Sequence, residues 1–236
     1  MDDWFSMIDA RRELPAGVVR DLHDVGFAVV PGPVPPGRLA QLAEAYDSAV
    51  ACAAPSDVSV GSTTIRVHDL VNRGPEFDGL YVYQPVLEAC CRVIGQPFKL
   101  SSMLARAVRP YAQAQRLHVD FEREGDGWPM VGFILMVDEF RADNGATRFV
   151  PDSHKSANDD GQVLACGPAG SVILYNGSVW HGHAANLTGE PRRSIQGAYI
   201  RRDAVAAIDQ AARIRPQTLD RIGSLAKYVL AVGQGE

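Results

Sequence analysis

The chain has 236 residues, of which 46% are hydrophobic and 22% are charged, a composition typical of folded globular proteins that argues against disorder. Its formal net charge of -5 disfavours nucleic acid as a partner, because nucleic-acid binders usually present a basic face. The acidic start Met1-Asp2-Asp3 is unlike a signal peptide, and no apolar run approaches the ~18 residues that cross a bilayer, so we expect a cytoplasmic protein without a membrane partner.

The first part of the chain indicates helices around one short strand. Apolar spacing predicts helices over residues 16–25, 38–51 and 76–94. Residues 27–30 predict a buried strand, which ends at a run of proline and glycine. The small polar residues 54–64 predict a loop. We therefore expect a helical layer over about residues 1–97.

Short apolar or alternating segments separated by turn signals follow from residue 98 onward. We predict strands over residues 100–108, 116–121, 131–137, 147–150, 171–175, 179–184 and 194–200. Helices are predicted over residues 204–214 and 217–232, with a break at Pro216. The outline is a single α+β domain, with a β core over about residues 98–202 that forms a jelly roll and a helical tail over residues 203–236.

The segment His118-Val119-Asp120 carries the first two candidate metal ligands. Side chains at positions i and i+2 of a strand point to the same face, so an imidazole and a carboxylate can converge on one ion. One further histidine would complete a facial triad of two histidines and one carboxylate, which leaves coordination positions open for an organic co-substrate and O₂. His181 and His183 are both candidates, and strand alternation alone does not choose between them.

Arg192 and Ser194 are candidates for binding an anion near this metal. Alternation places them on one face of a strand and Arg193 on the other. A guanidinium matches a carboxylate in a bidentate manner, and a hydroxyl adds a further donor. These are the groups that the distal carboxylate of 2-oxoglutarate requires.

The run from His118 to Tyr199 resembles the phytanoyl-CoA dioxygenase family of Fe(II)/2-oxoglutarate oxygenases. The segment 144–155, with Asn144-Gly145 and Ser153-His154, is similar to the family's N-G-x₅-P-G-S-H segment, although Asp152 stands where the family has glycine. In that family the distal iron histidine lies in a W/M-H-G context, and the co-substrate arginine follows eleven residues later. Trp180-His181-Gly182 and Arg192 match this spacing.

The resemblance implies that His118, Asp120 and His181 are the catalytic iron ligands and that Arg192 binds the co-substrate. His183 then supports the site or lines the pocket. The implied cofactors are Fe(II), 2-oxoglutarate and O₂. The implied fold is a double-stranded β-helix, the cupin-like jelly roll, and the implied reaction is hydroxylation of an unactivated C–H bond with release of succinate and CO₂.

The substrate is expected to be a small metabolite, and the protein a monomer or homodimer. Trp128, Tyr111 and His183 are the candidate substrate contacts. The segment 120–129 is similar to bacterial enzymes that hydroxylate small polar metabolites, ectoine hydroxylases among them. A zinc hydrolase or cupin-type isomerase with the same ligands, or a non-catalytic ligand-binding family member, is the alternative.

Overall fold

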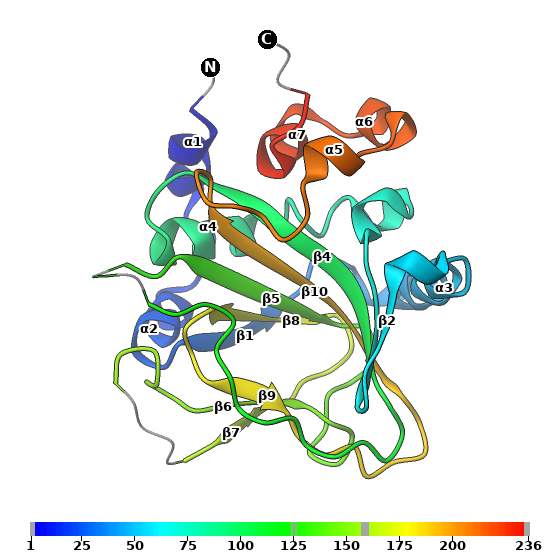
Figure 1. The fold of residues 1–236 in the computed structure, drawn as a ribbon. Coiled ribbons are helices and arrows are strands. Elements are labelled where there is room, and N and C mark those ends of the chain that lie inside the picture. Colours follow the sequence, from blue (N-terminus) through cyan, green and yellow to red (C-terminus); the bar gives the residue numbers. More distant parts are fainter. Residues whose placement is uncertain (1–2, 124, 126, 157–160, 234–236) are drawn as a thin grey trace.

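The computed structural model describes residues 3–123, 125, 127–156 and 161–233, and two facing sheets dominate it (Figure 1). The larger sheet has the strand order β1-β8-β5-β10-β4-β3-β2, and the smaller sheet has the order β7-β6-β9. Neighbouring strands pair antiparallel in both sheets. The α+β jelly roll expected from the sequence is therefore confirmed. In the larger sheet the strands are β1 Phe27–Pro31, β2 Val58–Val60, β3 Thr64–Val67, β4 Phe98–Val108, β5 Met130–Met136, β8 Ser171–Asn176 and β10 Arg192–Arg201. In the smaller sheet they are β6 Thr147–Phe149, β7 Val163–Ala165 and β9 His181–His183.

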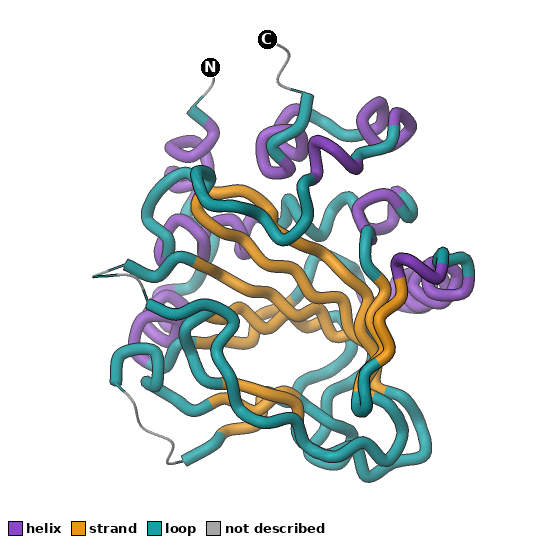
Figure 2. The backbone as a smooth tube through the Cα atoms, in the orientation of Figure 1, coloured by secondary structure: helices purple, strands orange, loops and turns teal. Residues whose placement is uncertain are grey.

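Helices cover the face of the larger sheet that points away from the smaller one, and further helices close one end (Figure 2). The N-terminal helices are α1 Trp4–Arg11, α2 Ala16–Asp24, α3 Leu39–Ala51 and α4 Gln84–Val93. The C-terminal helices are α5 Gln210–Arg213, α6 Pro216–Arg221 and α7 Ser224–Leu230. Helix α4 packs on β5 and β8, α2 packs on β1 and β8, and α7 packs on β4.

Strand alternation divides the interior into two cores. Ile195 and Tyr199 of β10 belong to the core between the larger sheet and the helices. Phe149 of β6 and Tyr175 of β8 belong to a second core between the two sheets. Because successive side chains point to opposite faces, the alternate β10 side chains, Gln196 and Ala198 among them, face the space between the sheets. This is the space that holds the site described below.

Several elements differ from their expected form. Residues 116–121 form no strand beyond one isolated bridge at His118. Residues 76–83 form no α-helix: Pro75–Phe77 is a short 3-10 helix and turns follow it, because Gly74, Pro75 and Gly79 interrupt the chain there. The expected loop 54–64 contains β2, which pairs with β3 at the sheet edge.

The N-terminal segment is more than a helical layer, since it supplies β1, β2 and β3 to the larger sheet. Residues 1–2 and 234–236, at the ends of the expected helical layer and tail, lie outside the described residues. No helix in the described ranges has both the length and the apolar character that crossing a bilayer requires.

Candidate metal centre

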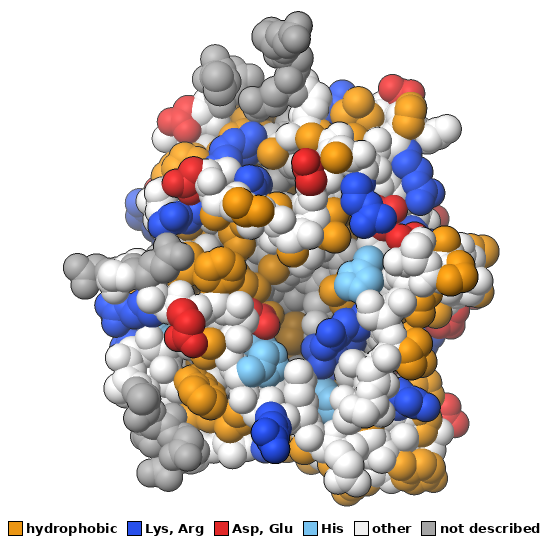
Figure 3. All heavy atoms as spheres, viewed as in Figure 1, with side chains coloured by type: hydrophobic (Ala, Val, Ile, Leu, Met, Phe, Trp, Pro, Cys, Tyr) orange, Lys and Arg blue, Asp and Glu red, His pale blue; other side chains and the backbone are white. Residues whose placement is uncertain are grey.

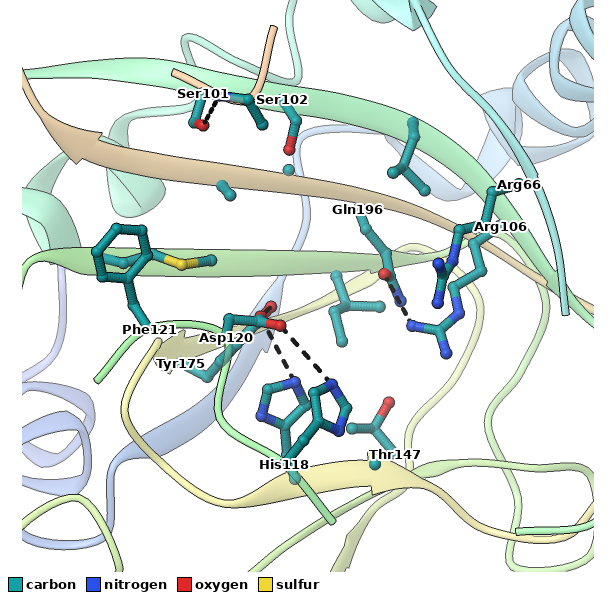
Figure 4. A pocket seen from close by; sticks show the side chains of 18 of the residues that line it. Arg66, Ser101, Ser102, Arg106, His118, Asp120, Phe121, Thr147, Tyr175 and Gln196 are labelled. Carbon is teal, nitrogen blue, oxygen red and sulfur yellow. Dashed lines mark hydrogen bonds and ion pairs between the residues drawn. The ribbon is translucent and has the colours of Figure 1, made fainter. Parts of the chain in front are cut away.

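Backbone pairing brings the three predicted ligands together. His118 and His181 exchange backbone hydrogen bonds of 3.0 and 2.9 Å, and the Asp120 N–H donates to the Gly177 carbonyl at 2.9 Å. Each of the three side chains offers a ligand atom, and these atoms all lie within 4.8 Å of one another. One Asp120 carboxylate oxygen lies 3.7 Å from His118 Nε2, and the other lies 3.5 Å from His181 Nε2 (Figure 4).

Backbone carbonyls orient both imidazoles. His118 Nδ1 lies 3.2 Å from the Arg116 carbonyl oxygen, and His181 Nδ1 lies 2.9 Å from that of Val179. Each Nδ1 is therefore the protonated, donating nitrogen, and each Nε2 keeps its lone pair for a metal. Burial lowers the pKa of His181 and favours the neutral ring that metal binding requires.

The donor set fits Fe(II). Two imidazole nitrogens and one carboxylate oxygen on one side of a point form half of an octahedron, and they leave the opposite positions open. A structural zinc site would be closed by a fourth protein ligand. Within the described residues, no fourth histidine, cysteine or carboxylate joins the group formed by His118, Asp120 and His181.

A cavity of about 350 Å³ opens beside these ligands. Figure 3 shows it as a hollow in the centre of one face, with Lys or Arg and His side chains along one side. Figure 4 shows His118 and Asp120 in its middle, Arg66 and Arg106 together at one end, and Ser101 and Ser102 toward the other.

Arg192 lines this cavity and is a buried cation without a carboxylate partner among the described residues. Its side chain is 2% exposed, and its guanidinium stacks 3.9 Å from the centre of the Phe140 ring. Nη2 donates to the Gly145 carbonyl at 2.8 Å, whereas Nε and Nη1 have no hydrogen-bond partner. Burial, followed by the nearby Arg106, lowers its pKa to about 9. Such a group is stabilised by an anion, because a buried charge without a partner is costly.

The phytanoyl-CoA dioxygenase family model matches residues 22–194, which include all three ligands and Arg192. The chain belongs to the phytanoyl-CoA dioxygenase family. It is thus a non-haem iron dioxygenase that uses Fe(II), 2-oxoglutarate and O₂, as predicted from the sequence.

Curated relatives of the chain are dioxygenases. The multifunctional dioxygenase ausE of Emericella nidulans is 28% identical over 209 residues, which cover 75% of this chain and 70% of that protein. The dioxygenase cdmA of Talaromyces verruculosus is 35% identical over 103 residues, which cover 37% of this chain and only 35% of that protein.

Solved structures share the fold. HygX from Streptomyces hygroscopicus, with nickel, 2-oxoglutarate and hygromycin B bound, has a TM-score of 0.69 at 18% identity and covers 82% of this chain and 90% of that one. The non-heme alpha ketoglutarate dependent carbocyclase SnoK from nogalamycin biosynthesis has a TM-score of 0.70 at 16% identity and covers 89% of this chain and 92% of that one.

His183 lies beside the metal ligands of this family member, but its ring nitrogens are turned elsewhere. Nδ1 lies 2.8 Å from the Ala184 carbonyl oxygen, and Nε2 lies 3.1 Å from Thr63 Oγ1. Burial lowers the pKa of His183 to about 4, so the ring is neutral at pH 7. It lines the cavity without joining the ligand group.

Ser194 lies in a different place from Arg192. Its side chain is fully buried, and its hydroxyl donates to the Arg106 carbonyl at 3.3 Å. It is absent from the cavity wall formed by the described residues. The neighbouring Arg193 pairs with Asp138 at 2.7 Å and with Asp47 at 2.7 Å on the opposite face, as the alternation predicts.

The structure adds two cationic residues to the site, Arg66 and Arg106. Arg66 of β3 lies directly opposite Arg106 of β4, and both line the cavity. Arg106 donates to Gln115 at 2.8 Å and to Gln196 at 3.2 Å, while its buried Nε has no partner. Burial, then Arg66, lowers the pKa of Arg106 to about 10. The signal available in the sequence was the alternation of Arg66 with His68.

Two of the three predicted substrate contacts lie outside the cavity wall. Tyr111 is 72% exposed. Trp128 packs against His154, with ring centres 5.3 Å apart, and against His23, with ring centres 6.2 Å apart. Both tyrosine and tryptophan are common at ligand sites and also in packing, and sequence composition does not distinguish these uses.

Proposed function

We propose that the chain hydroxylates an unactivated C–H bond of a small metabolite. The balanced reaction converts the substrate C–H, 2-oxoglutarate and O₂ into the substrate C–OH, succinate and CO₂. One observation carries the proposal: the open side of the His118, Asp120 and His181 group faces a cavity that also contains the partnerless guanidinium of Arg192.

Each residue has a defined task in this reaction. His118, Asp120 and His181 hold Fe(II), which supplies the oxidising chemistry when 2-oxoglutarate and O₂ are bound. Arg192, whose Nε and Nη1 have no partner, would bind the distal carboxylate of 2-oxoglutarate and so orient the co-substrate in the cavity. The Phe140 ring packs against the planar guanidinium of Arg192 and shields that side of it from water.

Asp120 favours oxygenation over halogenation. A halogenase of this broad class lacks the carboxylate, and chloride takes its place on the metal. Here the carboxylate occupies that position, and its Oδ2 is held by a hydrogen bond from Tyr175.

Two alternative functions leave features of the site unexplained. A zinc hydrolase or isomerase would leave Arg192 without a task. A non-catalytic ligand-binding protein would need neither the intact ligand set nor the buried arginine. Oxidations other than hydroxylation remain chemically close, because solved structures with this fold include the carbocyclase SnoK and the epimerase SnoN.

Oxygen labelling tests the dioxygenase chemistry on which the proposal rests. The protein is incubated with Fe(II), 2-oxoglutarate and ¹⁸O₂, and succinate is analysed by mass spectrometry. We expect succinate that carries one labelled oxygen atom, formed slowly in the absence of substrate. Unlabelled 2-oxoglutarate recovered without succinate would contradict the proposal and favour the hydrolase or the binding protein.

A further inference from the structure

Among the described residues of the cavity wall, the arginine side chains gather at one end. Arg192 of β10, Arg106 of β4 and Arg66 of β3 line one end, and the strand register places Arg66 and Arg106 opposite each other. Against these three cations, Asp120 is the single carboxylate among the described residues of the cavity wall. A dianionic co-substrate therefore belongs at this end.

The other end is lined by small or apolar side chains. Ser102 lies four residues before Arg106 on β4, which corresponds to roughly 13 Å along a strand. Its partner across the sheet is Ala198, and Ile200 lies opposite Met130 at the same end. Phe121 and Ala207 complete this wall, and none of these six side chains is charged.

A β-bulge shapes the uncharged end. Ala198 pairs with Ser102 and Tyr199 pairs with Leu100, so Ser101 is the extra residue on β4. A bulge can turn an additional side chain toward a site, and both Ser101 and Ser102 line the cavity. Ser101 Oγ accepts a hydrogen bond from the Ala207 N–H at 2.9 Å, and its carbonyl accepts one from the Ile208 N–H at 2.9 Å. The bulge thus fastens the segment 202–209 over this end.

Ser102 supplies a polar group at the uncharged end. No described residue forms a hydrogen bond with its hydroxyl, and Figure 4 shows that hydroxyl directed into the cavity. A hydroxyl can donate one hydrogen bond and accept others. It can therefore match one neutral oxygen on a ligand, but it cannot neutralise an ionised group.

We propose that the substrate presents a neutral, mainly apolar body to this end, with one hydroxyl or carbonyl group hydrogen-bonded to Ser102. The inference rests on the proposed function, because it assigns the cationic end to 2-oxoglutarate. A substrate carboxylate or ammonium at the far end would lose its hydration without gaining a partner. Such a substrate differs from the small polar metabolites on which the bacterial enzymes similar in segment 120–129 act.

A matched pair of rigid probes tests the proposal. The anaerobic complex of the protein with Fe(II) and 2-oxoglutarate is titrated with 1-adamantanol and, separately, with adamantane-1-carboxylate. Perturbation of its visible charge-transfer band reports occupation of the space beside the metal. We expect the alcohol to bind at least ten-fold more tightly than the carboxylate. Equal binding, tighter binding of the carboxylate, or no binding of either probe would overturn the proposal.

Two variants locate the probe. Ala198→Phe fills the uncharged end and is expected to weaken alcohol binding at least ten-fold, with its own charge-transfer band reporting that the variant is folded. Val60→Phe is the control, because Val60 lies on the edge strand β2, is 68% exposed and is not among the described residues of the cavity wall, and it is expected to leave both titrations unchanged. Unchanged alcohol binding in Ala198→Phe would place the probe elsewhere and overturn the assignment. Should Ala198→Phe not fold, the comparison of the two probes on the unaltered protein still decides the question.

These outcomes separate the two proposals. Absence of the charge-transfer band before any probe is added contradicts the proposed function itself. A normal charge-transfer band that neither probe perturbs contradicts only the proposal of a neutral, mainly apolar substrate.

Discussion

The Tyr175 hydroxyl donates a hydrogen bond of 2.7 Å to Oδ2 of Asp120. Tyr175 is deeply buried, and burial raises the pKa of its phenol well above the usual value, so the hydroxyl keeps its proton. The ring lies 4.9 Å from that of His181 and covers Gly132 on the neighbouring strand, where a larger residue would collide with it. Tyr175 therefore fixes the rotation of the Asp120 carboxylate and engages one of its two oxygens before any metal binds.

Tyr175→Phe is expected to weaken metal binding by about ten-fold or more. The variant keeps the ring and its packing and removes only the donor to an ionised carboxylate, and loss of such supporting contacts typically costs ~10–100-fold in metal affinity. Anaerobic calorimetric titration with Fe(II) or Co(II) measures the effect.

Tyr199→Phe is the matched control for this experiment. Tyr199 is also buried, and its hydroxyl donates to the Tyr81 carbonyl at 2.8 Å, away from the metal ligands. We expect a loss of thermal stability with unchanged metal affinity. Equal metal affinities for Tyr175→Phe and the unaltered protein would show that the Tyr175 contact has no bearing on the metal site.

His181→Ala and His183→Ala are expected to differ in metal content. His181 Nε2 faces Asp120 at 3.5 Å, whereas His183 Nε2 is engaged by Thr63. The first substitution should abolish iron binding, and the second should leave the iron content of the purified protein largely intact, as measured by atomic emission. The reverse pattern would overturn the choice of His181 as the ligand.

Arg192→Met is expected to raise the dissociation constant for 2-oxoglutarate on the order of 100-fold, because it removes a buried partner of a carboxylate while keeping a long side chain over Phe140. Arg193→Met is the control, because Arg193 pairs with Asp138 on the other face. Titration of the anaerobic charge-transfer band gives both constants. Similar constants for the two variants would assign the co-substrate carboxylate to another group.

His154 should make folding stability depend on pH. Burial lowers its pKa below the ordinary 6.5, so the folded protein binds this proton less readily than the unfolded chain does. The corresponding stability is fully present above about pH 6.5 and is lost as the pH falls through and below that value. Urea unfolding of the metal-free protein at about pH 7.5 and about pH 5.5 measures the loss. We expect a smaller pH dependence in His154→Gln, and an identical one would show that His154 does not contribute.

Much of the β core could be predicted because the sequence of each strand indicates a strand by itself. Strands β4, β5, β8 and β10 are apolar or alternating runs with turn residues at both ends, and each lies within a few residues of its predicted bounds. The segment 116–121 alternates equally well, yet it forms only a bridge at His118, because no strand pairs with it along its length. Local periodicity does not report whether a partner strand is available.

The metal-ligand positions could also be predicted from the sequence, whereas the residues that line the cavity could not. His118 and Asp120 stand out by residue type and spacing, and the family resemblance favours His181 over His183 as the third ligand. The pairing of Arg66 with Arg106, the bulge at Ser101 and the packing of Trp128 on His154 depend on contacts between residues far apart in the chain. The backbone at Asp152 was not predictable from the sequence either. Asp152 stands where the family has glycine, and it adopts the left-handed conformation with φ 66°. The turn therefore accommodates aspartate in place of glycine.

The anaerobic visible spectrum tests the central claim most directly. The protein is first loaded with Fe(II), and 2-oxoglutarate is then added without O₂. We predict a visible charge-transfer band that appears with 2-oxoglutarate, is absent in Asp120→Ala, and gives way to succinate formation when O₂ is admitted. No band and no succinate from the unaltered protein would contradict the assignment of this site as an iron and 2-oxoglutarate centre.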